Sequence, residues 1–114
     1  MAIVQNLVID QGSTFSIELT VYGDDRYPLN LTPYTPTAQL RKSPTSTSYT
    51  NFTCNKVDPG TSGKINIALT DEQTAALRQG RYMYDVVIES SGERFRVIEG
   101  IVTVMPSITK PVTP

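Results

Sequence analysis

Histidine and tryptophan are absent from this chain of 114 residues, and the only cysteine is Cys54. The lack of histidine removes the side chain most often used as a general base, a metal ligand or a switch near neutral pH. One cysteine cannot form a disulfide within the chain, and a thiolate nucleophile would have no histidine beside it. We therefore expect Cys54 to be a small packing residue, and we expect no catalytic, metal or cofactor site.

Charge and long apolar runs are also scarce. Charged residues make up 18% of the chain and the net charge is −1, so no basic surface for nucleic acid is expected. The first residues, MAIVQNLVIDQG, lack the basic start of a secretory signal, and no apolar run reaches the roughly 18 residues of a membrane span. We expect a protein made in a cytoplasm, with no membrane partner, that stays in solution or joins an assembly.

The chain is rich in segments where apolar and polar residues alternate. Residues 15–21 and 64–69 place every second residue on one apolar face, which is typical of a half-buried strand. Similar short segments lie at residues 7–10, 37–43, 52–54, 82–89 and 95–104. Turn signals recur about every ten residues, as in Asp58-Pro59-Gly60. This pattern predicts an all-β fold, a two-sheet antiparallel immunoglobulin-like β-sandwich of about seven strands with one short helix.

The one helix is predicted directly after the strand that ends at Leu69. Thr70 and Gln73 have the spacing of a capping box, and Gly80 is the expected left-handed residue after the helix end. The expected apolar contacts of this helix are Ala75, Ala76 and Leu77. We expect the helix to cover one end of the sandwich while the chain crosses from one sheet to the other.

A hairpin is predicted over the stretch RYMYDVVIESSGERFRVIEGIVTVMP. The residues expected to share one face of its first strand are Tyr82, Tyr84, Val86 and Ile88. The apolar phase shifts near Glu99-Gly100, which predicts a β-bulge there. Asp85 lies on the other face, where we expect an ion pair across the hairpin with Arg81, Arg94 or Arg96.

The remaining polar and aromatic groups offer little chemistry. Asp24-Asp25 is better explained as a charged turn than as part of a calcium site, which needs more oxygen ligands. Asp71 and Glu72 are explained by their place at a helix start, so a pair of glycosidase carboxylates is not expected. The tyrosines expected on loops, which could stack on a sugar, are Tyr27, Tyr34 and Tyr49.

Several segments in a fixed order carry a family resemblance. They are QGSTFSIELTV, PLNLTPYTPTAQLRKS, GKINIALTDEQTAAL, GRYMYDVVI and RVIEGIVTVMPSIT. Together they resemble the small β-sandwich domains of tailed-bacteriophage virion proteins, similar to the N-terminal domain of upper baseplate proteins. The resemblance covers roughly residues 9 to 108, and its specificity lies in the order and spacing of the motifs. Pro33 departs from the pattern, because the family usually has glycine before the residue that matches Tyr34.

The resemblance implies a bacteriophage structural protein without enzymatic activity, made in the bacterial host cytoplasm and carried on the virion. It would be an accessory adaptor of the tail or baseplate, or a capsid-decorating cement protein, bound in multiple copies to other phage structural proteins. A carbohydrate-binding adhesion module, with glycan as its partner, is the alternative. We expect an N-terminal arm over residues 1–6, a sandwich over residues 7–106 and an extended tail over residues 107–114, with both ends ordering on a neighbouring subunit.

Overall fold

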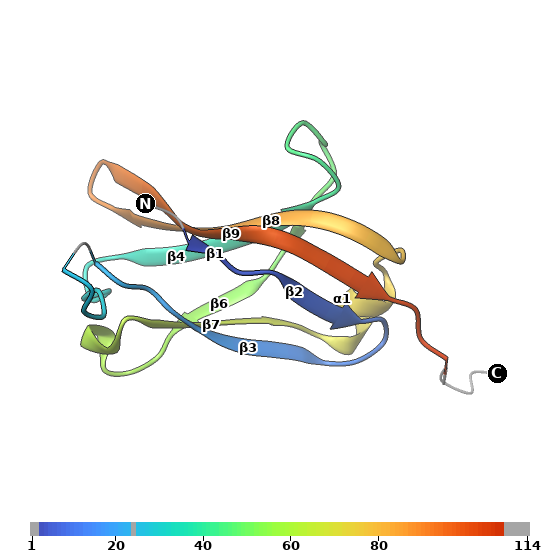
Figure 1. Ribbon diagram of the computed structural model, residues 1–114, viewed down its shortest axis with the longest axis horizontal. Helices are drawn as coiled ribbons and strands as arrows, with labels where there is room; N and C mark the ends of the chain where they lie inside the picture. Colours follow the sequence, from blue (N-terminus) through green and yellow to red (C-terminus); the bar gives the residue numbers. More distant parts are fainter. Residues whose placement is uncertain (1–2, 24, 109–114) are drawn as a thin grey trace.

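Two β-sheets stacked face to face account for most of the computed structural model, which describes residues 3–23 and 25–108 (Figure 1). The elements in chain order are β1 (Ile3–Val4), β2 (Leu7–Asp10), β3 (Phe15–Thr20), β4 (Thr35–Arg41), β5 (Thr50–Asn51), β6 (Thr53–Lys56), the short 3-10 helix η1 (Gly60–Ser62), β7 (Lys64–Leu69), α1 (Asp71–Ala75), β8 (Gly80–Ser90) and β9 (Glu93–Met105).

The strand order is that of an immunoglobulin-like sandwich. The six-stranded sheet has the order β1-β9-β8-β4-β5, with β2 also paired to β9, and the three-stranded sheet has the order β3-β7-β6. Immunoglobulin domains of variable type likewise extend the sheet that carries the last hairpin by a strand beyond its third member. The predicted all-β, two-sheet immunoglobulin-like fold with one short helix is therefore confirmed.

The pairing is not antiparallel throughout, because β1 and β2 both run parallel to β9. Alternation reports which face of a strand is buried and carries no information on strand direction, so the sequence could not show this. It also corrects the expected N-terminal arm. Ile3 and Val4 pair with Ile98 and Glu99 inside the sheet, whereas residues 1 and 2 lie outside the described residues.

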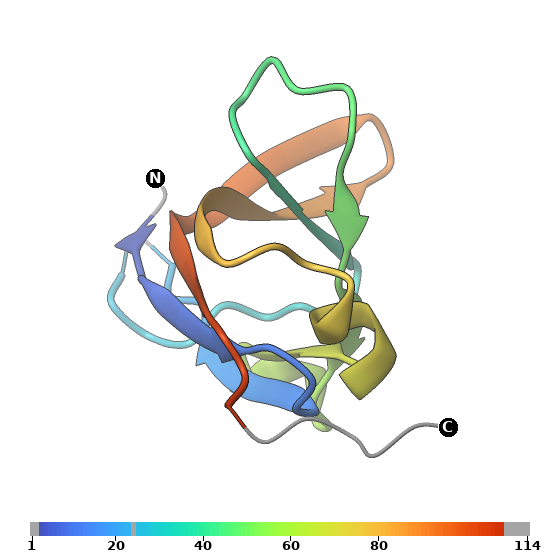
Figure 2. The ribbon, with the colours of Figure 1, turned by 90° about the vertical axis from the view of Figure 1, so that its right-hand side faces the viewer.

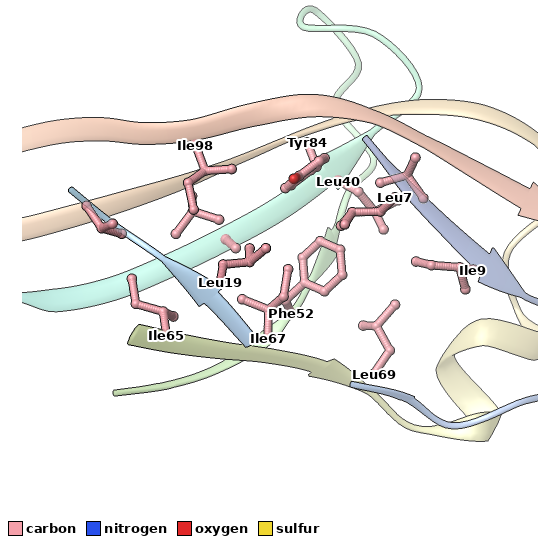
Figure 3. Packing of buried hydrophobic residues seen from close by; sticks show 14 of the residues in the cluster. Leu7, Ile9, Leu19, Leu40, Phe52, Ile65, Ile67, Leu69, Tyr84 and Ile98 are labelled. Atoms are coloured by element: carbon pink, nitrogen blue, oxygen red, sulfur yellow. The ribbon is translucent and has the colours of Figure 1, made fainter. Parts of the chain in front are cut away.

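The core lies between the sheets and is built mainly from alternate residues of the longer strands. Ile65, Ile67 and Leu69 of β7 are almost fully buried, as are Ala38 and Leu40 of β4. Phe52 sits where the chain leaves β5 for β6, and Figure 3 shows its ring between the two sheets. Its ring centroid is 6.2 Å from that of Phe15 and 6.1 Å from that of Tyr84. Burial of this aromatic cluster supplies a large apolar area to the core.

The helix α1 carries the predicted capping box. The Thr70 side chain accepts from the Gln73 backbone N–H, and the Gln73 side chain accepts from the Thr70 N–H. The helix is shorter than expected, because its C-cap is Ala76, and Gly80 begins β8 instead of ending the helix. The chain crosses here from the three-stranded to the six-stranded sheet, as predicted (Figures 1 and 2).

Only one of the three apolar contacts expected for the helix is confirmed, and it lies just beyond the C-cap of α1. Leu77 is buried, but Ala75 and Ala76 are exposed, and Thr74 is fully buried instead. The Thr74 hydroxyl donates to the Ser13 and Asp71 carbonyl oxygens at 2.9 and 3.0 Å. Thr74 therefore lies on the face of this short helix that packs against the rest of the protein.

The predicted bulge at Glu99-Gly100 is wrong in position. The register shift of the β8–β9 ladder lies between Val86 and Val87, where Val97 has no partner on β8. Gly100 stays in register with Tyr84, and a close backbone contact explains why this residue is glycine. A Cβ atom there would lie 2.3 Å from the Gln5 carbonyl oxygen, so the close passage of the β1–β2 connection requires the missing side chain.

Beyond β9, the described part of the predicted tail is short. The Ser107 N–H donates to the Gln11 side-chain oxygen at 3.2 Å, and Ile108 is 96% exposed. Residues 109–114, the rest of that tail, lie outside the described residues. Among the residues that the structure does describe, there is no helix with the length and apolar character to cross a membrane.

Candidate functional site

The outer faces of the two sheets differ in character. The three-stranded sheet turns polar side chains outward, among them Ser16, Glu18, Lys64 and Asn66. Ser16 donates to the Asn66 amide oxygen at 3.1 Å, and Lys64 pairs with Glu18 at 3.6 Å. This is the ordinary outer face of an antiparallel sheet in contact with water.

The outer face of the six-stranded sheet instead carries an apolar stripe. Its members and their exposed fractions are Val4 (71%), Val8 (63%), Met83 (46%), Met105 (45%) and Ile101 (41%). The strand register brings them together, because Met83 pairs with Ile101, while Val4 and Val8 pair with the β9 residues on either side of Ile101. Large exposed apolar patches on a folded domain indicate contact surfaces.

A hollow of about 560 Å³ opens on this face. Two of its walls are the β4–β5 loop, which contributes Pro44, and the β8–β9 hairpin, which contributes Arg94 and Arg96. Figures 1 and 2 show that both segments rise from the sheet on the side away from the three-stranded sheet. Val4, Met83 and Ile101 line its apolar part, and Asp85 and Arg96 are among the charged residues that line the rest. We call the apolar stripe and the hollow together the outer face.

Ion pairs border the apolar stripe. Arg96 Nε lies 3.1 Å from Asp85 Oδ2, and Arg96 Nη1 lies 3.9 Å from Glu99 Oε1. Of the three arginines expected as partners of Asp85, the structure therefore selects Arg96. A further pair joins Arg94 to Glu89 at 3.2 Å. These pairs are exposed and each stabilises the fold by only about 0–1 kcal/mol, so they define charge on the surface more than they hold the sheet together.

The guanidinium of Arg41 is turned toward the β4–β5 loop. It donates to the Ser46 carbonyl oxygen at 2.6 Å and to the Gln39 side-chain oxygen at 3.0 Å. Its central carbon also lies 4.6 Å from the centre of the Tyr49 ring, a cation–π contact. Arg41 thus holds one wall of the hollow in place.

The three tyrosines predicted on loops do not form one site. Tyr27 is 71% exposed in the β3–β4 loop, whereas Tyr34 is half-buried, its ring 6.5 Å from that of Phe95. Tyr34 directly precedes β4, and Tyr49 lies beyond the other end of that strand, against Arg41. Because Tyr34 and Tyr49 lie beyond opposite ends of β4, the three rings cannot all stack on one sugar.

The groups with catalytic or metal-binding chemistry are used in the fold. The half-buried Cys54 thiol has its pKa raised by burial to about 11, with a smaller opposing contribution from a backbone hydrogen bond. It is therefore protonated at neutral pH and a poor nucleophile. Asp25 accepts a hydrogen bond from the Tyr27 N–H at 3.0 Å within its turn, and Asp24 lies outside the described residues. The described residues contain no cluster of three side chains able to hold a metal ion.

The sequence contains one signal of the outer face that the predictions above do not include. Met83 and Ile101 interrupt the polar set of alternate positions on their strands, so both faces of β8 and β9 carry apolar residues. Alternation identifies the buried face of a strand, and exposed apolar residues on the opposite face do not alter that pattern enough to predict a contact surface. The contributions of Val4 and Val8 depend on the parallel pairing with β9, which the sequence does not reveal.

Comparison with known proteins finds no matching protein-family model and no similar curated protein. Solved structures with a similar arrangement include InlP of Listeria monocytogenes, with 18% sequence identity and a TM-score of 0.49. Another is the N-terminal Ig1-2 module of the Drosophila receptor protein tyrosine phosphatase DLAR, with 20% identity and a TM-score of 0.45. The alignments cover 89% and 94% of this chain but only 26% and 48% of those two chains.

Proposed function

We propose that this chain is a non-enzymatic structural protein that acts by binding other proteins through the outer face. The observation that supports it is the exposed apolar stripe on the six-stranded sheet. The three-stranded sheet, in contrast, turns polar side chains to the solvent. Such a stripe costs solubility unless a partner covers it. The ion pairs around it give a polar rim, the usual frame of a protein–protein contact.

The proposed setting is a tailed-bacteriophage particle. This part rests on the resemblance of the ordered motifs over residues 9–108, and not on the fold. We propose an accessory adaptor of the tail or baseplate, or a capsid-decorating cement protein, made in the host cytoplasm and bound to other phage structural proteins. Many copies on a repeated lattice would gain strength from avidity, so each contact could be modest.

The test is the composition of purified particles. Mass spectrometry of particles of the phage that encodes the chain should find it in multiple copies, and immunogold labelling should place it on the head or on the tail. Particles that lack the chain would contradict the virion role. Labelling confined to the head would favour the cement protein over the adaptor.

Glycan binding is the competing outcome, and a matched pair of variants separates it. The double variant Tyr27→Ala with Tyr34→Ala should retain binding to emptied particles, whereas Met83→Glu on the outer face should lose it. Binding to a glycan array that disappears in the tyrosine variant would favour adhesion instead. A circular dichroism melt of each variant controls for folding.

A further inference from the structure

On β8, the side chains on the two sides of Met83 carry charges of opposite sign. Along β8, Arg81, Met83 and Asp85 point to the same side of the sheet, a cation and an anion about 7 Å on either side of an apolar residue. Arg81 is exposed and has no ion pair with another described residue. Any partner with charge of one sign would be repelled at one of these two positions.

The neighbouring strands repeat this arrangement in register. One row across the sheet contains Val4, Glu99 and Asp85, and the row on the other side of Met83 contains Val8, Thr103 and Arg81. The central row holds the pair Ile101 and Met83. Each row therefore has a valine on the edge strand, a polar group on β9 and a charge on β8, with opposite charges in the two rows.

We propose that the outer face binds a second copy of this chain, face to face, about a two-fold axis that runs across the strands through Met83 and Ile101. This inference rests on the proposed role of the outer face as a binding surface. The rotation places the row that contains Asp85 in each copy over the row that contains Arg81 in the other copy. Val4 then meets Val8, Asp85 meets Arg81 and Glu99 meets the Thr103 hydroxyl, while Met83 and Ile101 meet their own counterparts.

The self-complementarity is what selects a second copy over another occupant. Residues of a two-fold interface contact each other reciprocally, so a surface must be complementary to itself. The outer face satisfies this at each of its three kinds of position: apolar on apolar, cation on anion, carboxylate on hydroxyl. Arg41 lies in the central row, but its guanidinium is directed at Ser46, Gln39 and Tyr49, which keeps it from facing its own copy.

The hollow also receives a group from the second copy in this arrangement. Met105 is four residues from the axis along β9. The position that faces it across the axis is that of Arg96, five residues away on the other side, because the unpaired Val97 adds one residue there. Met105 of the second copy would therefore cover the Arg96 end of the hollow, with its Asp10 beside that arginine. An exposed methionine and an edge carboxylate that has no ion pair with another described residue are thus used in the same contact.

The primary test is the mass of the purified chain in solution by light scattering after gel filtration. The wild type should be a dimer that dissociates on dilution. Met83→Glu places two carboxylates against each other at the axis and should raise the dimer dissociation constant by at least about tenfold. Thr53→Glu adds the same charge to the exposed outer face of the three-stranded sheet and should leave the dimer unchanged.

A charge exchange tests the pairing itself. Arg81→Glu alone should weaken the dimer, because the new carboxylate meets Asp85 of the second copy. Adding Asp85→Arg should restore it in part, because the pair across the axis is re-formed with opposite polarity while the Asp85–Arg96 pair within each chain is lost. If the wild type is monomeric at high concentration, or if the dimer is weakened by Thr53→Glu and not by Met83→Glu, the proposal is wrong.

A cross-link keeps the test decisive if Met83→Glu fails to fold. Facing sheets pack about 10 Å apart, so Met83→Cys in a Cys54→Ser background should form a dimer with a bismaleimide of that length. Thr53→Cys in the same background should not, and equal cross-linking of the two would overturn the proposal. A monomeric chain that is present in particles would refute the dimer and leave the proposed function intact. A dimer absent from particles would do the reverse.

Discussion

Tyr84 joins the core to the N-terminal segment at the scale of a single side chain. Its ring lies in the core beside Phe52, and its hydroxyl donates to the Gln5 carbonyl oxygen at the connection between β1 and β2. Burial raises the pKa of this phenol from 10.0 to about 12, because the charged phenolate is poorly solvated there. The neutral hydroxyl is therefore part of the folded state.

Replacement of Tyr84 by phenylalanine should destabilise the protein by about 1–3 kcal/mol, since the Gln5 carbonyl loses its partner. The wild type should also lose stability at alkaline pH. The contribution of neutral Tyr84 is complete below pH 10.0 and is lost as the pH rises toward about 12. Urea unfolding of both proteins across this range measures both effects, with Tyr49→Phe as an exposed control. An equal alkaline loss in Tyr84→Phe would show that other groups cause it.

The Cys54 thiol should react slowly with iodoacetamide in the folded protein. Its pKa is raised by burial from 9.0 to about 11, so at neutral and mildly alkaline pH the thiolate fraction is far below that of a free cysteine. The rate should rise toward that of a model thiol only as the pH approaches 11 or the protein unfolds in urea. A rate in native protein equal to that in urea would contradict this.

At the scale of elements, the parallel attachment of β1 and β2 to β9 depends on a glycine. The Gln5 N–H donates to the Glu99 carbonyl oxygen at 2.9 Å, and the Asn6 side-chain oxygen accepts from the Ile101 N–H at 3.0 Å. Between these bonds the chain passes directly over Gly100. The segment is therefore held by a backbone contact that leaves no room for a Cβ.

Gly100→Ala should destabilise the protein by about 1–3 kcal/mol, because the new methyl overlaps the Gln5 backbone. The loss should be local, so amide hydrogen exchange should accelerate first in residues 3–10. Gly92→Asn at the tip of the same hairpin is the control, since it meets no neighbouring atom and asparagine tolerates its positive φ. Uniform exchange throughout the chain would mean that the segment does not open by itself.

Leu77, which follows the C-cap of α1, closes one end of the sandwich: it is 7% exposed, and its carbonyl oxygen accepts from the Gln11 side chain at 2.6 Å. Leu77→Ala should cost about 2–5 kcal/mol by thermal or urea unfolding, and Leu77→Asp should unfold the domain. Ala75→Asp, on the exposed side of the same helix, should change stability by less than about 0.5 kcal/mol. An intact melting transition in Leu77→Asp would show that the helix is not a necessary cover.

At the scale of the whole molecule, the two sheets present surfaces of different character to the solvent. The three-stranded sheet turns a polar face to water, and the six-stranded sheet presents the apolar stripe and the hollow. Both sheets share one core, so the outer face can change without loss of the fold.

A combined variant with Val8→Thr and Ile101→Thr should test this separation. Both side chains are substantially exposed and point away from the core, so the melting temperature should change little. Self-association and particle binding should both weaken, because apolar area is removed from the contact. A melting temperature lowered as much as in Leu77→Ala would show that the stripe is part of the folding core.

Much of the fold could be predicted from residue patterns because burial and capping leave local signatures. Alternation in residues 15–21 and 64–69 identified the inward faces, and Thr70 with Gln73 identified the start of the helix. The sequence predicts a longer helix than α1, since Gly80 matches a helix end in sequence but is the first residue of β8. The bulge was misplaced because Gly100 was explained by a phase shift, whereas the actual cause is contact with Gln5, far away in the chain.

The sequence by itself determined the fold class, the capped helix and the hairpin, because each follows from spacing between near neighbours along the chain. Only the tertiary structure decided how β1 and β2 attach to β9, which arginine pairs with Asp85, and that the loop tyrosines lie apart. The outer face belongs to the second group. Val4, Met83 and Ile101 come together through strand pairing over long sequence separations, and pairing partners are set by the energy of the whole fold.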